Sequence, residues 1–414
     1  MPNSPVFAYD IDRIRADFPS LASGWALFDG PGGTQTPRQV IAAIAAALEG
    51  PIANRGAITL GERNAESTVI GARQAIADLV NGDPRGVVFG RSATQLAYDF
   101  SRLLSASWLP GDEIIVTRLD HDSNVRPWVQ AAQRRGATVR WLDFDPVTSQ
   151  VSIAQFQDLL SERTKLVAVT AASNLLGTLP PVAALTTLAH TVGALVYVDG
   201  VHYTAHACVD VQALGADFFA CSSYKFLGPH LGALVASPAL LERLTPDKLL
   251  PSTNEVPERF EYGTLPYELL AGVTAAVDYL AGLDGSTAGA AMRRPCLVSS
   301  FAALEEHESS LRAQLETGLA KLTGVTVHSR AAQRTPTTLI TFAGRPASHA
   351  YQFLAAHKVA APASNFYGLE ASRRLGLGDA GGLRMGLAPY TSTDDIVRLL
   401  TGLDEFVNNS GATA

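Results

Sequence analysis

The sequence predicts an α/β fold, with a mostly parallel sheet covered by helices on both faces and a smaller α+β domain after it. Short apolar runs alternate with helical segments from residue 87 to residue 236, and such alternation is typical of parallel sheets. A stretch rich in glycine and small residues at 282–289 then separates this region from elements in a different order. The chain has 414 residues, 47% hydrophobic and 17% charged, which is enough for two domains with a large core.

The part before the alternation is expected to contain three helices and one turn. Residues 10–18 are expected to form a short helix, and the glycine-rich residues 28–34 a turn. Residues 37–48 are apolar at helical spacing and begin with a proline, which suits a first helical turn. The third helix is expected at 65–80, closed by an Asn-Gly pair.

The alternating region supplies the sheet. Each expected strand is a short apolar run bounded by polar residues or glycine, and each expected helix is longer, with apolar residues at helical spacing. The strands are expected at residues 87–89, 113–117, 139–142, 166–170, 195–198, 217–221 and 231–236. The helices between them are expected at residues 93–106, 125–135, 153–160 and 182–191.

The smaller domain is expected after the glycine-rich stretch, and the N-terminal segment is expected to pack on it. Its elements are a long helix, two short strands and two further helices, at residues 298–322, 325–328, 338–342, 347–357 and 394–407. We therefore expect a large domain at 22–283 and a small domain formed by 1–21 and 284–414.

Composition restricts the location and the partners. A net charge of −7 and a pI near 5.7 argue against nucleic acid as the main partner. The three cysteines form no CxxC pair or disulfide framework, and the first residues lack the apolar core of a signal peptide, so we expect a cytoplasmic protein. Residues 166–198 carry no Asp, Glu, Lys or Arg, but an Asn, a Gly and two Pro interrupt them, so no membrane span is expected.

Lys225 and Asp199 are the most informative pair for function. Lys225 closes a hydrophobic strand, and Asp199 ends another. An amine and an acid at the carboxyl ends of two such strands reach one crevice, where open α/β sheets bind ligands. The pair fits pyridoxal phosphate (PLP), with the lysine for the Schiff base and the aspartate for the ring nitrogen.

Three weaker signals follow other strands at the same edge, and each has a plainer alternative. Residues 90–94 lie between a strand and a helix, where free N–H groups bind phosphate, but Ser92 is also an ordinary helix N-cap. His121 could stack on a flat ring, although a lone loop histidine is usually a surface residue. Asn174 could bind a phenolic oxygen, although asparagine is also a common turn residue.

Three segments make the comparison with a known family specific: residues 198–202 (Val-Asp-Gly-Val-His), 209–218 and 222–229 (Ser-Ser-Tyr-Lys-Phe-Leu-Gly-Pro). They resemble the core of class V aminotransferases, nearest to the cysteine desulfurase and selenocysteine lyase branch and its "cysteine desulfurase-like" members. The resemblance extends from the glycine-rich turn to Arg384. It implies the PLP-dependent transferase fold of type I, with a mostly parallel seven-stranded sheet sandwiched by helices, and a homodimer with a shared active site.

The resemblance also implies roles for individual residues. Lys225 would carry PLP, Asp199 would pair with the pyridinium nitrogen, and His121 would stack on the ring. The other cofactor contacts would come from Ala93, Thr94, Asn174, His202, Ser222, Tyr224 and, across the subunit interface, Thr264. Arg384 would clamp the substrate carboxylate, a task that suits a bidentate guanidinium, and Arg55 would lie near the substrate mouth.

The chain departs from the family pattern at several positions. The family usually has glutamine at His202 and histidine at Tyr224, and desulfurases carry a nucleophilic cysteine on a loop before the carboxylate arginine. Residues 359–384 contain no cysteine, and Tyr367 stands in the corresponding stretch, either as a substitute proton donor or as a packed aromatic. We expect a C–S or C–Se lyase acting on an amino acid, with an aminotransferase or an epimerase as the alternative.

Other motifs in the sequence match enzymes with different chemistry, but each lacks the residues or the structural context that this chemistry needs. Residues 222–225 match S-x-x-K, but the S-D-N and K-T-G partners of serine acyl enzymes are absent. Residues 376–381 match G-x-G-x-x-G in an inverted context, which indicates a loop. His202 and His206 have zinc-helix spacing without the glutamate or a third ligand, so no metal is expected. A non-catalytic scaffold would be expected to lose Lys225 or Asp199, and both are present.

Overall fold

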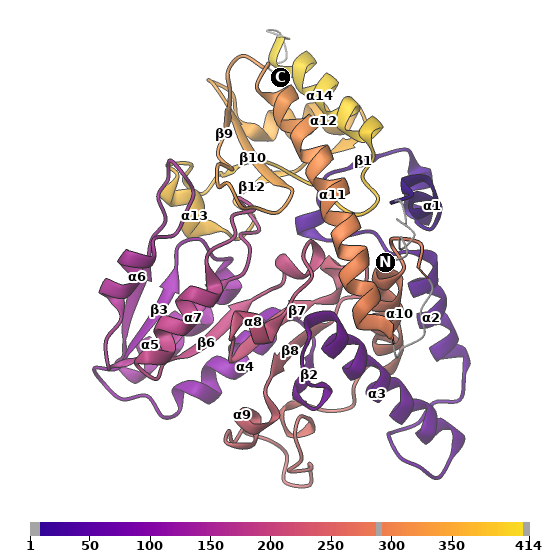
Figure 1. Cartoon of the computed structure of the whole chain (residues 1–414), viewed down its shortest axis with the longest axis vertical. Helices are drawn as coiled ribbons and strands as arrows, with labels where there is room; N and C mark the ends of the chain where they lie inside the picture. Colours follow the sequence, from indigo (N-terminus) through magenta and orange to yellow (C-terminus); the bar gives the residue numbers. More distant parts are fainter. Residues whose placement is uncertain (1–8, 287–291, 409–414) are drawn as a thin grey trace, which may run out of the picture.

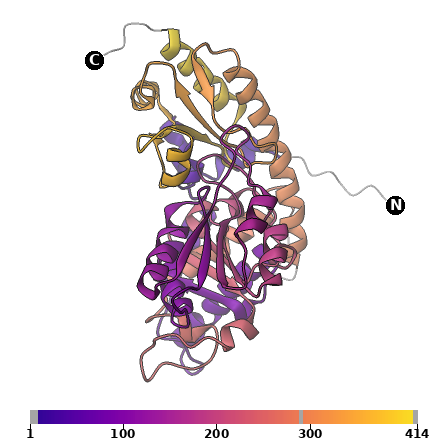
Figure 2. The same cartoon turned by 90° about the vertical axis from the view of Figure 1, so that its left-hand side faces the viewer.

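The structure is a computed structural model of the chain and describes residues 9–286 and 292–408 (Figure 1). A larger part contains a central sheet with helices on both faces, and a C-terminal part lies over one end of it (Figures 1 and 2). The long helix α11 (Arg293–Leu319) runs along both parts. Among the described residues, no helix is both long and apolar enough to cross a bilayer.

The central sheet has seven strands, as predicted, and their order is β2-β8-β7-β6-β5-β3-β4. All neighbouring pairs are parallel except those of β8, which is antiparallel to β2 and β7. The strands are β2 (Val87–Gly90), β3 (Glu113–Thr117), β4 (Thr138–Leu142), β5 (Thr164–Thr170), β6 (Leu195–Asp199), β7 (Phe218–Ser222) and β8 (Gly232–Ala236). Each matches an expected strand to within two residues.

Burial on both faces explains why the central strands are continuous apolar runs. In β5, Val167 and Val169 belong to one core cluster, whereas Leu166 and Ala168 belong to the cluster on the opposite face. Strands that are buried on both sides need apolar residues at every position. The helices that cover the sheet are α4 (Ala93–Ser105), α5 (Arg126–Arg135), α6 (Ile153–Leu159), α7 (Val182–Thr191), α8 (Val211–Leu214) and α9 (Pro238–Glu242).

Four further helices precede or follow the sheet: α1 (Ile11–Ala16), α2 (Arg38–Glu49), α3 (Leu60–Val80) and α10 (Tyr267–Ala281). Helix α3 begins five residues before the expected start, because Thr59 and Glu62 form a capping box. Helix α10 was not expected; it packs on α2 and α3 and buries much of its surface.

The C-terminal part contains a four-stranded antiparallel sheet in the order β12-β13-β10-β9. Its strands are β9 (Val325–Val327), β10 (Thr337–Phe342), β12 (Ala363–Ser364) and β13 (Gly382–Gly386), and its helices, besides α11, are α12 (Ala347–Ala356), α13 (Leu369–Arg374) and α14 (Thr393–Asn408). Strand β1 (Ala26–Leu27) pairs with β11 (Val359–Ala360), which joins the start of the chain to this part. The expected boundary at 282–289 lies partly outside the described residues, and the domain limits stay a prediction.

Candidate active site

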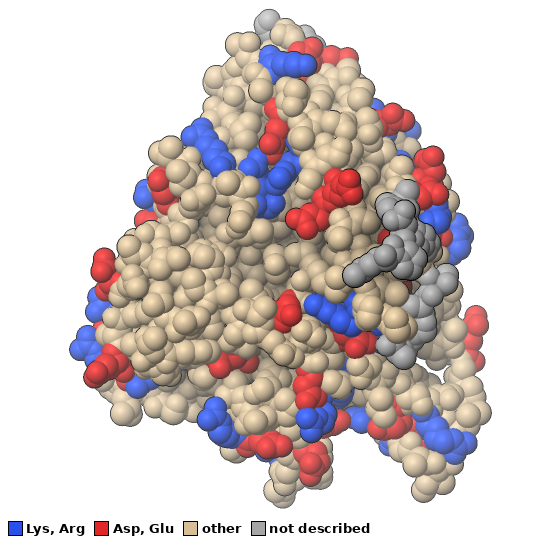
Figure 3. Space-filling view, in the orientation of Figure 1, with Lys and Arg blue, Asp and Glu red and all other residues tan. Residues whose placement is uncertain are grey.

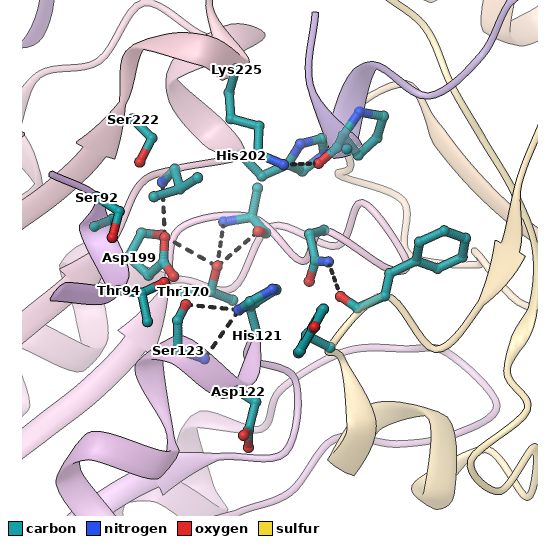
Figure 4. Close-up of a pocket in the computed structure, with 18 of the residues that line it drawn as sticks. Ser92, Thr94, His121, Asp122, Ser123, Thr170, Asp199, His202, Ser222 and Lys225 are labelled. Carbon is teal, nitrogen blue, oxygen red and sulfur yellow. Dashed lines mark hydrogen bonds between the residues drawn. The ribbon is translucent and has the colours of Figure 1, made fainter. Parts of the chain in front are cut away.

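A cavity of about 650 Å³ lies at the edge of the sheet where the parallel strands end. The side chains that line it follow β2, β3, β5, β6 and β7, and segment 364–367 and β13 of the C-terminal part complete the wall. Figure 4 shows Lys225, Asp199, His121, Ser92 and Ser222 around this space. Crevices of this kind are the usual ligand sites of open α/β sheets.

Lys225 lies in the 3-10 turn η6 (Ser223–Lys225) that directly follows β7, and its side chain is buried. Its Nζ donates a hydrogen bond to the carbonyl of Pro31, in the glycine-rich turn. Burial, and then the positive charge of Arg384, lower the pKa of the amine to about 7. The neutral, nucleophilic form of the amine is therefore accessible near neutral pH.

Asp199 is the last residue of β6, beside β7. Its Oδ1 accepts a hydrogen bond from the N–H of Val201 at 2.9 Å. Burial raises the pKa of the carboxyl group to about 6, although the Val201 N–H and the charge of Lys225 oppose the rise. A cationic partner inside the cavity would favour the ionised carboxylate further.

The loop between β2 and α4 forms one end of the cavity. Ser92 caps α4 by accepting a hydrogen bond from the N–H of Gln95 at 3.1 Å, as the plainer interpretation of this loop predicts. Ser92, Ala93 and Thr94 also line the cavity, at the positive end of a helix dipole. Gly232 permits this geometry, because a Cβ there would lie 2.4 Å from the carbonyl carbon of Ser92.

His121 is held in one tautomer in the loop after β3. Its Nδ1 accepts a hydrogen bond from the N–H of Ser123 at 3.1 Å and lies 2.7 Å from the Ser123 hydroxyl, so a neutral ring carries its proton on Nε2 (Figure 4). Burial, and then the charges of Lys225 and Arg384, lower the pKa of the imidazole to about 4. The ring is therefore uncharged at neutral pH and offers a flat face to a ligand.

Segment 364–367 closes the cavity opposite the sheet. Phe366 and Tyr367 both have left-handed backbones, with φ of 52° and 57°, a conformation that large side chains rarely adopt. The Nδ2 of Asn174 donates to the carbonyl of Phe366 at 2.9 Å, and the N–H of Asp122 donates to the carbonyl of Tyr367 at 2.7 Å. The ring of Tyr367 lies 5.4 Å from that of His121.

Arg384 lies in β13, and its buried guanidinium lines the cavity. Its guanidinium forms an ion pair with Asp29 at 2.6 Å, donates to the carbonyl of Asn174 at 3.1 Å, and lies 3.7 Å from the centre of the Phe366 ring. Its Nε is buried without a partner among the described residues, as is the Oδ1 of Asn174. Buried polar atoms of this kind normally have partners, so both have unused capacity for a ligand.

The cavity brings together most of the predicted site residues. Those that line it are Ala93, Thr94, His121, Asn174, Asp199, His202, Ser222, Tyr224, Lys225, Tyr367 and Arg384. Thr264 and Arg55 do not; Thr264 is exposed, and Arg55 forms ion pairs with Glu66 and Glu258 at 2.8 and 2.9 Å. Thr264 was expected to act across a subunit interface and Arg55 to lie near the substrate mouth, and both roles stay predictions.

Several lining residues were missed by the sequence analysis, among them Asp29, Arg126, Thr170 and Phe366. Asp29 lies in the glycine-rich turn, which the sequence marked only as a turn. Thr170 is the last residue of a predicted strand, at the sheet edge where the site was expected, so the sequence pattern could have identified it. Phe366 comes from a distant loop, and no local pattern places it near Arg384.

Comparison with known proteins gives a consistent picture. The profile of the aminotransferase class-V family matches residues 26–399. An uncharacterized protein of Mycobacterium tuberculosis is 34% identical over 96% of this chain and all of its own length. A probable cysteine desulfurase of Pseudomonas aeruginosa is 31% identical over 94% of this chain and 96% of its own. The solved structure of the Escherichia coli cysteine desulfurase CsdA covers 96% of this chain and 98% of its own, with a TM-score of 0.84 and 26% identity.

Proposed function

The chain belongs to the class V aminotransferase family of PLP-dependent enzymes, and from this premise we propose that it binds PLP at Lys225 and cleaves a C–S or C–Se bond of an α-amino acid. The observation that carries the proposal is the convergence of Lys225 and Asp199 from adjoining strands in one cavity.

The residues present fit PLP. The loop before α4 offers N–H groups and the hydroxyls of Ser92 and Thr94 to a phosphate. The carboxylate of Asp199 suits a protonated pyridine nitrogen, which would restore the ionised form that burial disfavours. The unpartnered Oδ1 of Asn174 is an acceptor for a phenolic hydroxyl.

When bound, PLP supplies an electron sink for the bonding electrons at Cα of an amino acid. Asp199 would keep the ring nitrogen protonated, and neutral His121 would cover the ring. Arg384 would hold the substrate carboxylate through its free donor capacity, which sets the orientation of Cα. Lys225, with a pKa of about 7, would take the Cα proton as a general base.

The absence of a thiol from the cavity wall bears on the reaction type. Among the described residues, no cysteine lines the cavity; Cys221 is buried in β7, where burial raises the pKa of its thiol to about 12. A transfer of sulfur to the protein therefore has no acceptor there. We propose instead that the β-substituent leaves with its bonding electron pair, so that cysteine and water give pyruvate, ammonia and sulfide. The hydroxyl of Tyr367 would protonate the leaving group.

We also propose a homodimer with a shared active site, in which Thr264 would reach the partner's phosphate site. The loop that carries Thr264 is anchored by Arg73, which pairs with Glu261 at 2.8 Å. Arg55 extends this network through Glu258. The side chains of Arg73 and Glu261 are buried, and a network anchored in this way supports a defined loop rather than a free one.

Product analysis tests the reaction type. Purified holoenzyme is incubated with L-cysteine, L-selenocysteine and L-alanine, and sulfide or selenide, keto acid and cofactor absorbance are followed. The proposal expects sulfide with equimolar pyruvate from cysteine, and no product from alanine. One keto acid per active site with conversion of the cofactor to its pyridoxamine form would indicate an aminotransferase, and racemised substrate an epimerase; either result overturns the lyase proposal.

A further inference from the structure

A buried histidine–glutamate pair lies behind the wall of the active-site cavity. The Nδ1 of His206 donates to the two carboxylate oxygens of Glu308, at 3.1 and 3.0 Å. Their side chains are only 4% and 3% exposed. Both residues line a second cavity, of about 450 Å³, which shares no lining residue with the active-site cavity. This cavity lies between α11 and segment 332–336, and Figure 3 shows basic and acidic side chains together on that face of the molecule, beside α11.

Burying the side chains of His206 and Glu308 has a cost in the free energy of folding. Glu308 lies in the buried stripe of α11 that otherwise contains Leu304, Leu311 and Leu315. Removing two ionisable groups from water costs free energy that their mutual attraction often fails to recover, and apolar residues of similar volume are commonly as stabilising or more so. Stability alone therefore does not account for a carboxylate at this position.

The pair contacts one residue of the active-site wall. The ring of His206 lies 4.9 Å from the ring of His202, at an interplanar angle of 69°. His202 lines the active-site cavity and is itself buried. The ring of His202 therefore contacts the active-site cavity and also the ring of His206, which belongs to the His206–Glu308 pair.

Two threonine hydroxyls lie beside the ring of His202. Its Nε2 lies 2.9 Å from the hydroxyl of Thr335 and 3.0 Å from that of Thr337. The Thr335 hydroxyl also lies 3.4 Å from the carbonyl of Gly177 and 3.4 Å from the Thr337 hydroxyl. Nε2 therefore has a hydroxyl partner in either neutral tautomer of His202, and these contacts alone do not select one tautomer.

We propose that Glu308 and His206 are positioning residues of the active site, which hold His202 in one ring orientation and one tautomer and supply a negative charge behind the cofactor. The inference rests on the proposed binding of PLP. The charged and titratable groups that act on His202 are His206 on its own segment, Lys225 of η6 and Arg384 of β13. Glu308 of α11 lies beyond His206, as its hydrogen-bond partner. Burial, with the nearby His206, Lys225 and Arg384, lowers the pKa of His202 well below its ordinary value, which agrees with a neutral ring.

The pH titration of the cofactor's visible absorbance in purified holoenzyme tests the proposal. In Glu308→Gln the carboxylate is lost while the side-chain volume stays, so the cationic form of the lysine-linked cofactor is less favoured. We expect the titration midpoint to fall by about one pH unit, a tenfold change in the protonation ratio. Glu305→Gln is the matched control, because Glu305 is exposed, one turn away on α11; its midpoint should equal that of the wild type.

A double variant separates positioning from folding. Glu308→Leu with His206→Phe fills the space with apolar groups, so we expect a thermal midpoint at least as high as that of the wild type. The absorbance midpoint should still be shifted. A titration like that of the wild type in either variant, or a shift of the same size in Glu305→Gln, would overturn the positioning role.

Nitrogen-15 spectra of histidine-labelled holoenzyme give a second readout. We expect a single neutral tautomer of His202 in the wild type, and mixed tautomers or titration of the same ring in Glu308→Gln. An unchanged tautomer in the variant would contradict the proposal. If wild-type protein fails to bind PLP at all, the proposed function itself fails, and that outcome is distinct from an unshifted titration in a variant that binds PLP.

Discussion

At the scale of single residues, the site depends on two cations that share one buried cavity. Lys225 and Arg384 each disfavour a charge on the other, and the carboxylates of Asp29 and Asp199 offset the effect on the lysine. The lysine yields its proton more readily than the guanidinium, since an ammonium changes its pKa on burial while a guanidinium stays charged. The amine can therefore lose its proton near neutral pH, whereas the guanidinium keeps its positive charge.

Arg384→Gln should raise the pH at which apoenzyme reacts with PLP. The amine reacts when neutral, so the rate rises with pH through a midpoint near the amine pKa of about 7. Loss of a neighbouring positive charge raises that pKa, and we expect the midpoint to move up by about one pH unit. The measurement is the initial rate of absorbance change against pH after PLP is added.

Asp29→Asn provides the opposite control for this prediction. The carboxylate of Asp29 raises the pKa of Lys225, so its removal should move the midpoint down. Midpoints that move in the same direction in both variants would show that the charges around the amine have been assigned wrongly.

At the scale of elements, the proposed phosphate site depends on the close contact of β8 with the start of α4. A side chain at Gly232 would overlap backbone atoms of Ser92 and Ala93, which cannot move aside as a flexible side chain can. The strand and the helix therefore approach closely only because position 232 lacks a Cβ.

Gly232→Ala should weaken PLP binding and lower the thermal midpoint. Overpacking of this kind costs about 1–3 kcal/mol, and here it displaces the N–H groups that would hold the phosphate. Gly50→Ala is the control, since a Cβ there meets only an ordinary contact at 3.4 Å. Thermal unfolding and equilibrium dialysis with PLP measure the two effects; a Gly232→Ala protein with normal affinity for PLP would contradict this account of the phosphate site.

Elements with a clear pattern were predictable from the sequence, and those without one were not. Strand β3 and helix α7 match their expected bounds. The strand is an apolar run between polar residues, and the helix has apolar residues at helical spacing that begin after a proline. Helix α10 was missed because it is apolar on most sides, being packed between α2, α3 and α11, and so lacks an amphipathic period. The early start of α3 was signalled by its capping residues, Thr59 and Glu62, which the sequence analysis passed over.

The candidate site was predictable where its residues lie at the ends of strands. Asp199, Lys225 and His121 follow strands of one edge, so the fold alone brings them together. Arg384 came from the family resemblance, and its contacts with Asp29 and Phe366 join three distant segments that no local pattern relates.

At the scale of the whole molecule, three exposed apolar residues lie in the segment that carries Arg55, which we propose for the subunit interface. Ile52, Ile58 and Leu60, in and before the first turn of α3, are 46%, 85% and 54% exposed. Arg55 lies in the same segment. Where exposed apolar side chains form a patch, they commonly mark a protein–protein contact.

The proposed dimer should depend on this segment. We expect the wild type to sediment as a dimer, and Ile58→Asp to shift it towards monomer, because a charge would be buried in the interface. Val397→Asp is the control, an exposed apolar residue on α14 that should leave the dimer intact. A wild-type monomer with full activity would refute the shared active site.

The central claim is that one lysine carries the cofactor, and chemical mapping tests it most directly. Holoenzyme is reduced with borohydride, digested, and the pyridoxyl-labelled peptide is identified by mass spectrometry. The account predicts a single label on Lys225, and none in Lys225→Ala. A label on Lys165, Lys248, Lys321 or Lys358 instead, or retained labelling in the variant, would contradict it.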